Sequence, residues 1–217
     1  MEHIIKIQRQ RRNDDKSYYQ SFIYVSNNDD ETIINALKNI NAQEVILDID
    51  GHTAEKIEFE CSCLQKKCGA CALVINHRPM LGCDAKLNSL GKETVVGPLH
   101  KFNVIADLIV DRSILFENLK TLKLWLEKDA DINDKRRWLS YMSSECLQCG
   151  LCLEACPNFY VGGNFFGMSA IAPTTKLLSE LDKTDRKIIA KLYNTHCYKG
   201  CAKSLACKNV CPRKIET

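Results

Sequence analysis

The sequence lacks a long hydrophobic run and lacks an excess of charge of one sign. No stretch approaches the ~20 apolar residues that a helix needs to cross a bilayer. The opening segment MEHIIKIQRQRR has no apolar region followed by a small-residue cleavage site, so no signal peptide is expected. We therefore expect a cytoplasmic chain that meets a membrane only through partners. The 30 basic and 27 acidic residues leave a net charge of +3, which argues against a nucleic-acid-binding surface.

Cysteine, in contrast, is abundant, with 13 residues in 217. An odd number without an export signal fits a disulfide scaffold poorly, and cytosolic thiols are kept reduced. Metal ligation is the better explanation. The cysteines form two groups separated by 62 cysteine-free residues, 84–145, which indicates two domains. We expect these domains to span residues 1–100 and 101–217.

The first domain has the composition of a small mixed sheet with one crossing helix, the outline of a β-grasp fold. The helix is predicted after the N-cap residues of NNDD (27–30), because Ile33, Ile34, Leu37 and Ile40 would share one face. Runs rich in β-branched and aromatic residues indicate the strands. Strands are predicted at residues 3–8, 17–25, 44–49, 56–60, 72–76 and 93–96.

The second domain is expected to be mainly helical, which makes the fold class α+β. An apolar stripe at helical spacing begins just after Val104 and is interpreted as core packing. A polar connection at 128–137 follows it, and 177–193 reads as one further amphipathic helix between two cysteine clusters. The stripe consists of Ile105, Leu108, Ile109, Leu115, Leu119, Leu122 and Leu126.

The first cysteine group has the spacing C-x4-C-x2-C-x11-C, from Cys63, Cys68, Cys71 and Cys83. Plant-type ferredoxins bind a 2Fe-2S cluster with C-x4-C-x2-C and a distant fourth cysteine. Small residues such as those of GA (69–70) let the backbone approach the cluster. A tetrahedral zinc site, the alternative, usually takes two C-x2-C pairs. Cys61, two residues before the first ligand, is expected to be a non-ligating thiol.

The second group opens with CLQCGLCLEACP (146–157), the complete C-x2-C-x2-C-x3-C-P motif. In two-cluster ferredoxins its fourth cysteine ligates the other cluster. The reciprocal segment is CAKSLACKNVCP (201–212), in which a serine replaces the second cysteine. The predicted 4Fe-4S ligands are therefore Cys146, Cys149, Cys152 and Cys211.

Cys156, Cys201 and Cys207 are left for the other cluster, and three thiolates suit a 3Fe-4S centre that lacks one corner. Ser204 stands at that corner, and a hard oxygen donor seldom replaces thiolate on iron. A competing interpretation makes Cys197 an irregular fourth ligand. Otherwise Cys197 is a spare thiol.

These ordered motifs resemble the iron–sulfur subunit of succinate dehydrogenases and fumarate reductases. Two softer stretches also match, YYQSF (18–22) and PLHKFNVIADLIVD (98–111), so that the resemblance covers nearly the whole chain. It implies a chain that relays electrons between the FAD of a flavoprotein subunit and a quinone, such as menaquinone, through the three clusters. It also implies a membrane-anchor subunit and a place at the inner face of the cytoplasmic membrane. No residue here need act as acid, base or nucleophile, and no Ser–His–Asp set is visible.

The quinone end of the sequence departs from the family. Many members have an aromatic pair where Tyr160 and Val161 stand, and some have a histidine where Ala202 stands. Candidates for the neighbourhood of the quinone are Pro157, Tyr160 and Lys203. Two rival functions stay open: an electron relay for another flavoprotein reductase, of the heterodisulfide-reductase kind, and a zinc-stabilised binding module.

Overall fold

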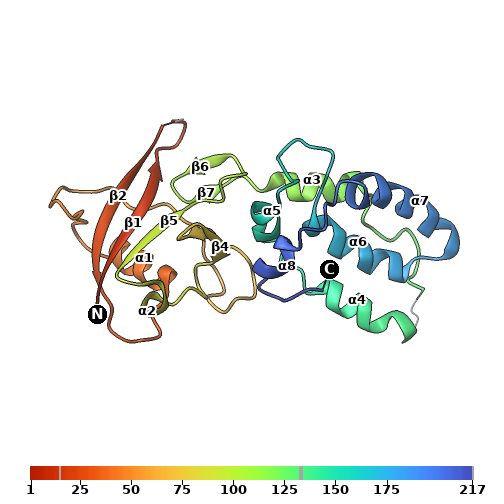
Figure 1. The fold of residues 1–217 in the computed structure, drawn as a ribbon, viewed down its shortest axis with the longest axis horizontal. Helices are drawn as coiled ribbons and strands as arrows, with labels where there is room; N and C mark the ends of the chain where they lie inside the picture. Colours follow the sequence, from red (N-terminus) through yellow and green to blue (C-terminus); the bar gives the residue numbers. More distant parts are fainter. Residues whose placement is uncertain (15, 132–133, 217) are drawn as a thin grey trace. The chain divides into compact units, whose positions relative to one another are not determined.

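The computed structural model describes residues 1–14, 16–131 and 134–216. The chain forms two compact units, Met1–Asp111 and Arg112–Thr217 (Figure 1). Residues 101–111, which the change of sequence pattern had placed with the second domain, belong to the first unit in this division.

The first unit is built on a five-stranded mixed sheet with the order β2-β1-β5-β3-β4. The central strands β1 and β5 are parallel, and the other neighbours are antiparallel. Strands predicted at 3–8, 17–25, 72–76 and 93–96 are confirmed within a few residues. The strands are β1 (Glu2–Gln10), β2 (Ser17–Val25), β3 (Ala72–Ile75), β4 (Arg78–Leu81) and β5 (Glu93–Gly97).

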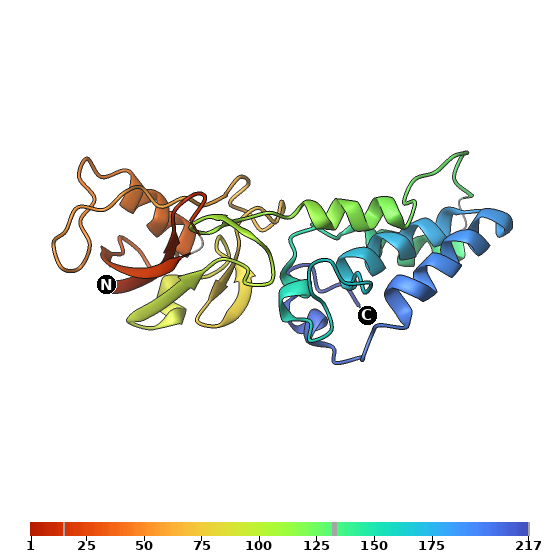
Figure 2. The same ribbon diagram turned by 90° about the horizontal axis from the view of Figure 1, so that it is seen from above.

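Helix α1 (Ile33–Asn41) lies over one face of this sheet (Figure 2). Its predicted apolar face is confirmed, because Ile33, Ile34, Leu37 and Ile40 are all buried. Thr32, rather than NNDD, caps the helix by accepting a hydrogen bond from the Asn35 N–H. Alternate side chains of β1, as the period of a strand requires, and all four side chains of β3 complete the core.

The strands predicted at 44–49 and 56–60 are not formed. In the first segment Val45, Leu47 and Ile49 are exposed, and only an isolated bridge joins Leu47 to Thr53. Residues 55–60, all within the described part, form neither helix nor strand, because their neighbours offer side chains in place of a strand edge. The composition of these two segments was therefore wrong about sheet pairing.

The helical stripe predicted from residue 105 is also wrong in its first half. Residues 104–110 form a hairpin of β6 (Val104–Ala106) and β7 (Ile109–Val110), with Asp107 at a φ of 42° in the turn. Helix α3 (Ser113–Thr121) begins after it and buries Leu115. A short helix, α2 (Leu87–Leu90), completes the first unit.

The second unit is mainly helical, as predicted. The segment 177–193 is two helices rather than one, because the chain turns at Leu181 and Asp182 caps the second helix. Residues 132–133 of the polar connection at 128–137 lie outside the described residues. The elements are η1 (Asp134–Arg136), α4 (Arg137–Ser144), α5 (Leu151–Ala155), α6 (Met168–Glu180), α7 (Lys183–Tyr193), η2 (Asn194–Tyr198) and α8 (Ala206–Val210).

Candidate iron–sulfur cluster sites

The first cysteine loop turns its backbone N–H groups toward a thiol. The Sγ of Cys63 accepts hydrogen bonds from the N–H groups of Gln65 at 3.4 Å and Lys67 at 3.3 Å. Leu64, Lys66 and Gly69 have φ between 54° and 75°. Alternation of right- and left-handed residues makes a concave array of N–H groups that favours anions. The loop is therefore shaped for a thiolate and for the sulfides of a cluster.

The β3–β4 hairpin brings two further cysteines of this group together. Cys71 directly precedes β3, and one residue, Gly82, separates the end of β4 from Cys83. The N–H of Cys83 lies 3.4 Å from the Sγ of Cys71, to which it donates a hydrogen bond. Asn76 and His77 close the hairpin with φ of 47° and 63°, the pattern of a type I′ turn. The register of this hairpin fixes the two sulfurs as neighbours.

The four sulfurs act on one another electrostatically. Hydrogen bonds from the Gln65 and Lys67 N–H groups and from the Cys68 side chain lower the pKa of Cys63 to about 7. Burial, with the charges of Cys83 and Cys68, raises the pKa of Cys71 to about 12. Metal ligation requires the thiolate form. Iron would therefore displace the thiol proton readily at Cys63, whereas at Cys71 the binding of iron must offset the cost of ionising a buried thiol. Cys61, half-buried, is not among these interactions.

The second and third cysteine loops repeat one backbone geometry 55 residues apart. Gln148 and Gly150 have φ of 51° and 86°, and Lys203 and Leu205 have φ of 56° and 59°. Each loop leads into a five-residue helix, α5 or α8, and these two helices lie side by side (Figures 1 and 2). The sequence showed only loosely repeated spacings, whereas the structure shows two copies of one supersecondary unit.

The repeat brings Cys211 to the first loop. Cys146, Cys149, Cys152 and Cys211 line one cavity of about 30 Å³. The pKa values of Cys146, Cys149 and Cys152 are raised, that of Cys149 to about 11. Burial is the largest cause, and the charge of Cys211 contributes. The crossing that the two-cluster motif predicts is therefore present in the fold. Four thiols packed this closely and this deeply are unfavourable as four charges unless a cation binds among them.

Cys156, Cys201 and Cys207 line a second and larger cavity, of about 420 Å³. The pKa of Cys207 is raised, mainly by burial and further by the charges of Cys156 and Cys201. Ser204 lines the same cavity and occupies in the repeat the place of Cys149. Its Oγ accepts a hydrogen bond from the Ala206 N–H at 3.5 Å, as the Cys149 sulfur does from the Leu151 N–H. The serine thus stands where a fourth thiolate would stand.

Cys197 lines this cavity as well, from the π-helical turn η2, but it is fully buried in an apolar cluster. Leu122, Phe166 and Ala170 pack around it. Burial alone raises the pKa of Cys197 to about 12. Cys197 differs from Cys207 in that neighbouring thiolates contribute to the raised pKa of Cys207 and not to that of Cys197.

The three residues predicted to lie near a quinone differ in whether they line the larger cavity. Lys203 lines the larger cavity. Pro157 and Tyr160 fall outside its described lining, and Tyr160 is 67% exposed. Sequence inspection missed the apolar and several polar residues of the lining, among them an asparagine and three aromatic residues, for which no cysteine spacing gives a signal. The asparagine and the aromatic residues are Asn158, Phe165, Tyr193 and Tyr198.

The fold and the three thiol groups define an iron–sulfur protein in which a two-iron ferredoxin domain precedes a 4Fe-4S ferredoxin domain. Residues 4–117 match the family described as "2Fe-2S iron-sulfur cluster binding domain". Residues 142–215 match the family described as "4Fe-4S dicluster domain". Among the described residues, no helix is both long and apolar enough to span a bilayer.

Comparison with curated relatives narrows this class. The succinate dehydrogenase iron–sulfur subunit of Bacillus subtilis is 31% identical over 195 residues, which are 84% of this chain and 76% of the relative. The fumarate reductase iron–sulfur subunit of Haemophilus influenzae is 26% identical over 198 residues, 80% of this chain and 77% of the relative. The chain belongs to the family of succinate dehydrogenase and fumarate reductase iron–sulfur subunits.

Two further similarities add to this picture. An uncharacterized iron–sulfur protein of Methanocaldococcus jannaschii is 30% identical over 98% of this chain, which spans only 41% of that relative. A chain of the Mycobacterium smegmatis Sdh1 complex in the apo form has the same fold, with a TM-score of 0.76 at 22% identity. The match covers 99% of this chain and 90% of the other.

Proposed function

We infer that this chain is the electron-transfer subunit of a succinate dehydrogenase or fumarate reductase complex. Electrons would pass between the FAD of a flavoprotein subunit and a quinone, through 2Fe-2S, 4Fe-4S and 3Fe-4S clusters. A membrane-anchor subunit would hold the chain at the inner, cytoplasmic face of the membrane. The family membership of the chain supports each of these statements.

The ligand assignment follows the three thiol groups. Cys63, Cys68, Cys71 and Cys83 would hold the 2Fe-2S cluster in a domain whose parallel β1–β5 pair and crossing helix α1 favour a β-grasp fold. Cys146, Cys149, Cys152 and Cys211 would hold the 4Fe-4S cluster. Cys156, Cys201 and Cys207 would hold the 3Fe-4S cluster. The bound clusters supply one-electron chemistry, while the protein supplies N–H donors and burial, which set the reduction potentials.

One observation carries the proposal: the two loops repeat their backbone geometry and exchange their last cysteines, while Ser204 replaces one ligand in the second loop. Structural zinc takes a closed tetrahedral set of four ligands at each site, which Cys156, Cys201 and Cys207, with a serine in the fourth place, do not supply. Two clusters that exchange electrons, by contrast, must lie close together.

The test is purification of the native complex followed by metal and activity analysis. We expect a brown protein that has the iron of one 2Fe-2S, one 4Fe-4S and one 3Fe-4S cluster, accompanied by a flavoprotein with succinate or fumarate activity. A colourless chain with stoichiometric zinc would rule out the cluster assignment.

The Methanocaldococcus jannaschii relative favours a second candidate. The region similar to this chain makes up only 41% of that relative, so a segment of this kind also forms part of a longer iron–sulfur protein. This chain would then serve a different flavoprotein reductase, of the heterodisulfide-reductase kind. Co-purification with a flavoprotein that reduces neither fumarate nor quinone would favour this candidate over the first.

A further inference from the structure

A buried ion pair lies in the first unit, outside the thiol groups. The Nε of Arg9 lies 2.9 Å from the Oδ1 of Asp107, and the two residues are only 2% and 5% exposed. The contact has the distance of an ion pair, although it lacks the alignment of a hydrogen bond at Nε. Charged residues are rarely buried this completely, since their desolvation costs more than their attraction returns unless further hydrogen bonds satisfy them. The burial of this ion pair therefore needs a structural explanation.

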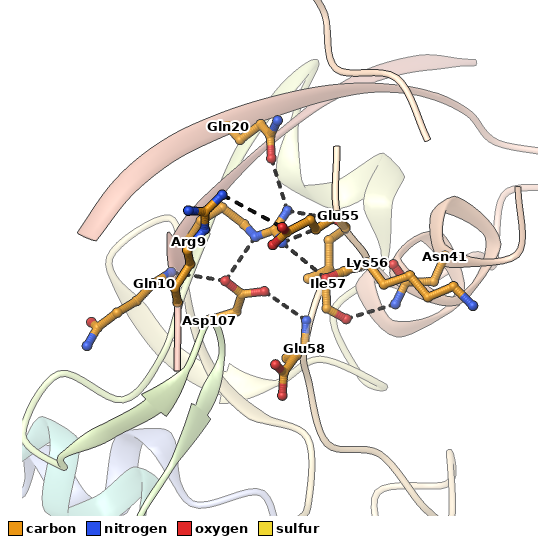
Figure 3. Close-up of polar contacts among 10 residues, drawn as sticks. Arg9, Gln10, Gln20, Asn41, Glu55, Lys56, Ile57, Glu58 and Asp107 are labelled. Atoms are coloured by element: carbon orange, nitrogen blue, oxygen red, sulfur yellow. Dashed lines mark hydrogen bonds and ion pairs between the residues drawn. The ribbon is translucent and has the colours of Figure 1, made fainter. Parts of the chain in front are cut away.

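The reason lies in residues 55–58, which the two side chains hold (Figure 3). The guanidinium of Arg9 donates to the carbonyls of Glu55 at 3.3 Å and Lys56 at 3.1 Å. The Oδ2 of Asp107 accepts the N–H of Glu58 at 2.9 Å, while its Oδ1 accepts the N–H of Gln10 at 3.0 Å. One ion pair thus ties residues 55–58 to β1 and to the turn between β6 and β7.

Asn41 holds the same segment from the end of α1. Its side chain accepts the Ile57 N–H and donates to the Ile57 carbonyl, both at 2.8 Å (Figure 3). Ile57 is buried, so its backbone polar groups need hydrogen-bond partners, which a strand would find in a ladder. Here the side chains of Arg9, Asn41 and Asp107, which we name the anchor residues, replace the ladder.

The anchored segment leads directly into the first cysteine loop. Glu58 precedes Cys63 by five residues, whereas Cys71 and Cys83 are held by the β3–β4 hairpin. The candidate ligands of the 2Fe-2S cluster are thus supported in two different ways. Sheet hydrogen bonds hold Cys71 and Cys83 in place, whereas the position of Cys63 depends on the anchor residues.

We propose that Arg9, Asn41 and Asp107 are positioning residues for the 2Fe-2S cluster, because they fix the entry of the loop that presents Cys63. The proposal rests on the proposed function, since it takes Cys63, Cys68, Cys71 and Cys83 as the ligands. Partners that orient ligands from outside the coordination sphere typically change metal affinity about 10- to 100-fold when they are mutated. Arg9 suits this role because its planar guanidinium donates to the Gln20 side chain and to two carbonyls at once, in a fixed geometry that a lysine ammonium lacks.

The test uses the full chain with all its clusters, as Arg9→Lys, Asp107→Asn and Asn41→Ala. In each variant we expect iron to leave the 2Fe-2S cluster for a chelator about 10- to 100-fold faster, with a broadened EPR signal of the reduced cluster. The release rates from the other two clusters should not change. Asn41→Ala keeps the test valid if either charge variant fails to fold, because it leaves the ion pair intact.

Two controls separate positioning from general destabilisation. Glu31→Gln weakens a buried network with Tyr24 elsewhere in the same unit, and Arg12→Ala removes an exposed ion pair to Glu58. Neither should alter the 2Fe-2S signal or its rate of iron release. The proposal is overturned if the anchor variants lose iron no faster than Glu31→Gln at matched melting temperature. Absence of any 2Fe-2S signal in the unaltered chain would instead overturn the proposed function.

Discussion

At the scale of single residues, Gln148 is the side chain best placed to tune a cluster. Its Nε2 lies 3.3 Å from the Sγ of Cys146 and donates also to the carbonyl of Ser169 at 2.8 Å. The hydrogen bond to the Ser169 carbonyl fixes the side-chain amide of Gln148, so that the hydrogen bond to the Cys146 sulfur is maintained. Hydrogen bonds to cluster sulfurs are among the factors that set the reduction potential.

Replacing Gln148 by leucine should lower the reduction potential of the 4Fe-4S cluster. A hydrogen bond to sulfur stabilises the reduced cluster, which is the more negative state, and a net value of about 1 kcal/mol corresponds to roughly 40 mV for one electron. An EPR-monitored redox titration measures this shift. Lys203→Leu, at the equivalent place in the repeat, is the matched control and should leave this potential unchanged. An unaltered potential in Gln148→Leu would contradict the assignment.

Ser204 is the residue that decides the composition of the third cluster. Because its backbone repeats that of Cys149, a cysteine at this place would present its sulfur to the larger cavity. Ser204→Cys should therefore gain a fourth iron and lose the EPR signal of an oxidised 3Fe-4S cluster. Cys197→Ser, in contrast, should change neither iron content nor signal. If Cys197→Ser costs an iron, Cys197 is a ligand and the three-iron assignment is wrong.

At the scale of elements, Asp182 caps helix α7 at the break between α6 and α7. Asp182 accepts the N–H groups of Thr184 and Asp185 at 2.8 and 2.9 Å, and these two bonds hold the pKa of its carboxyl below its usual range. A lowered pKa in the folded state means that the cap stabilises the fold above the ordinary pKa of an aspartate. This stabilisation is lost as the pH falls through the folded-state pKa.

Asp182→Ala should lower the melting temperature of the second unit by a few degrees at neutral pH, because the first turn of α7 loses its acceptor. The difference from the unaltered protein should vanish in acid, where the carboxyl is protonated in both states. Calorimetry at several pH values measures it. Asp182→Ser, which keeps a capping oxygen at every pH, should remove the pH dependence of the effect. A constant difference between Asp182→Ala and the unaltered protein across the titration would contradict this account.

Elements could be predicted from the sequence where their own periodicity decided the structure. β1, β2 and α1 follow their apolar patterns directly. The segments 44–49 and 56–60 have the same composition as strands. The backbone partners of 44–49 include the nearby His52 and Ala54, whereas 56–60 is held by residues far away in the sequence, such as Arg9 and Asp107. The hairpin of β6 and β7 was hidden because an apolar residue at every third or fourth place fits a helix and a short hairpin equally well.

At the scale of the whole molecule, cysteine spacing predicted three groups of thiols, and the structure brings the members of each group together. Spacing works here because three thiolates on one short loop must surround a cluster and a fourth must arrive from elsewhere. What it could not give is the shared backbone geometry of residues 146–157 and 201–212. That geometry depends on residues in the left-handed backbone conformation, such as Gln148 and Leu205. Glutamine and leucine rarely adopt this conformation, so the residue types do not predict it.

The equivalence of these two segments also explains how the chain could hold two unlike clusters in one fold. The frame of each site is the same, with a loop, a short helix and a cysteine before proline. The difference between a 4Fe-4S and a 3Fe-4S centre then reduces to one side chain, Ser204 against Cys149. Electron transfer to and from partner subunits would proceed through both centres.

EPR spectroscopy of the oxidised complex tests this central claim most directly. Three ferric ions have an odd number of electrons, whereas oxidised 2Fe-2S and 4Fe-4S clusters have paired spins. We predict one paramagnetic centre per chain in the oxidised protein, and its loss in Ser204→Cys. An oxidised sample that has its full iron complement and no EPR signal would contradict the account.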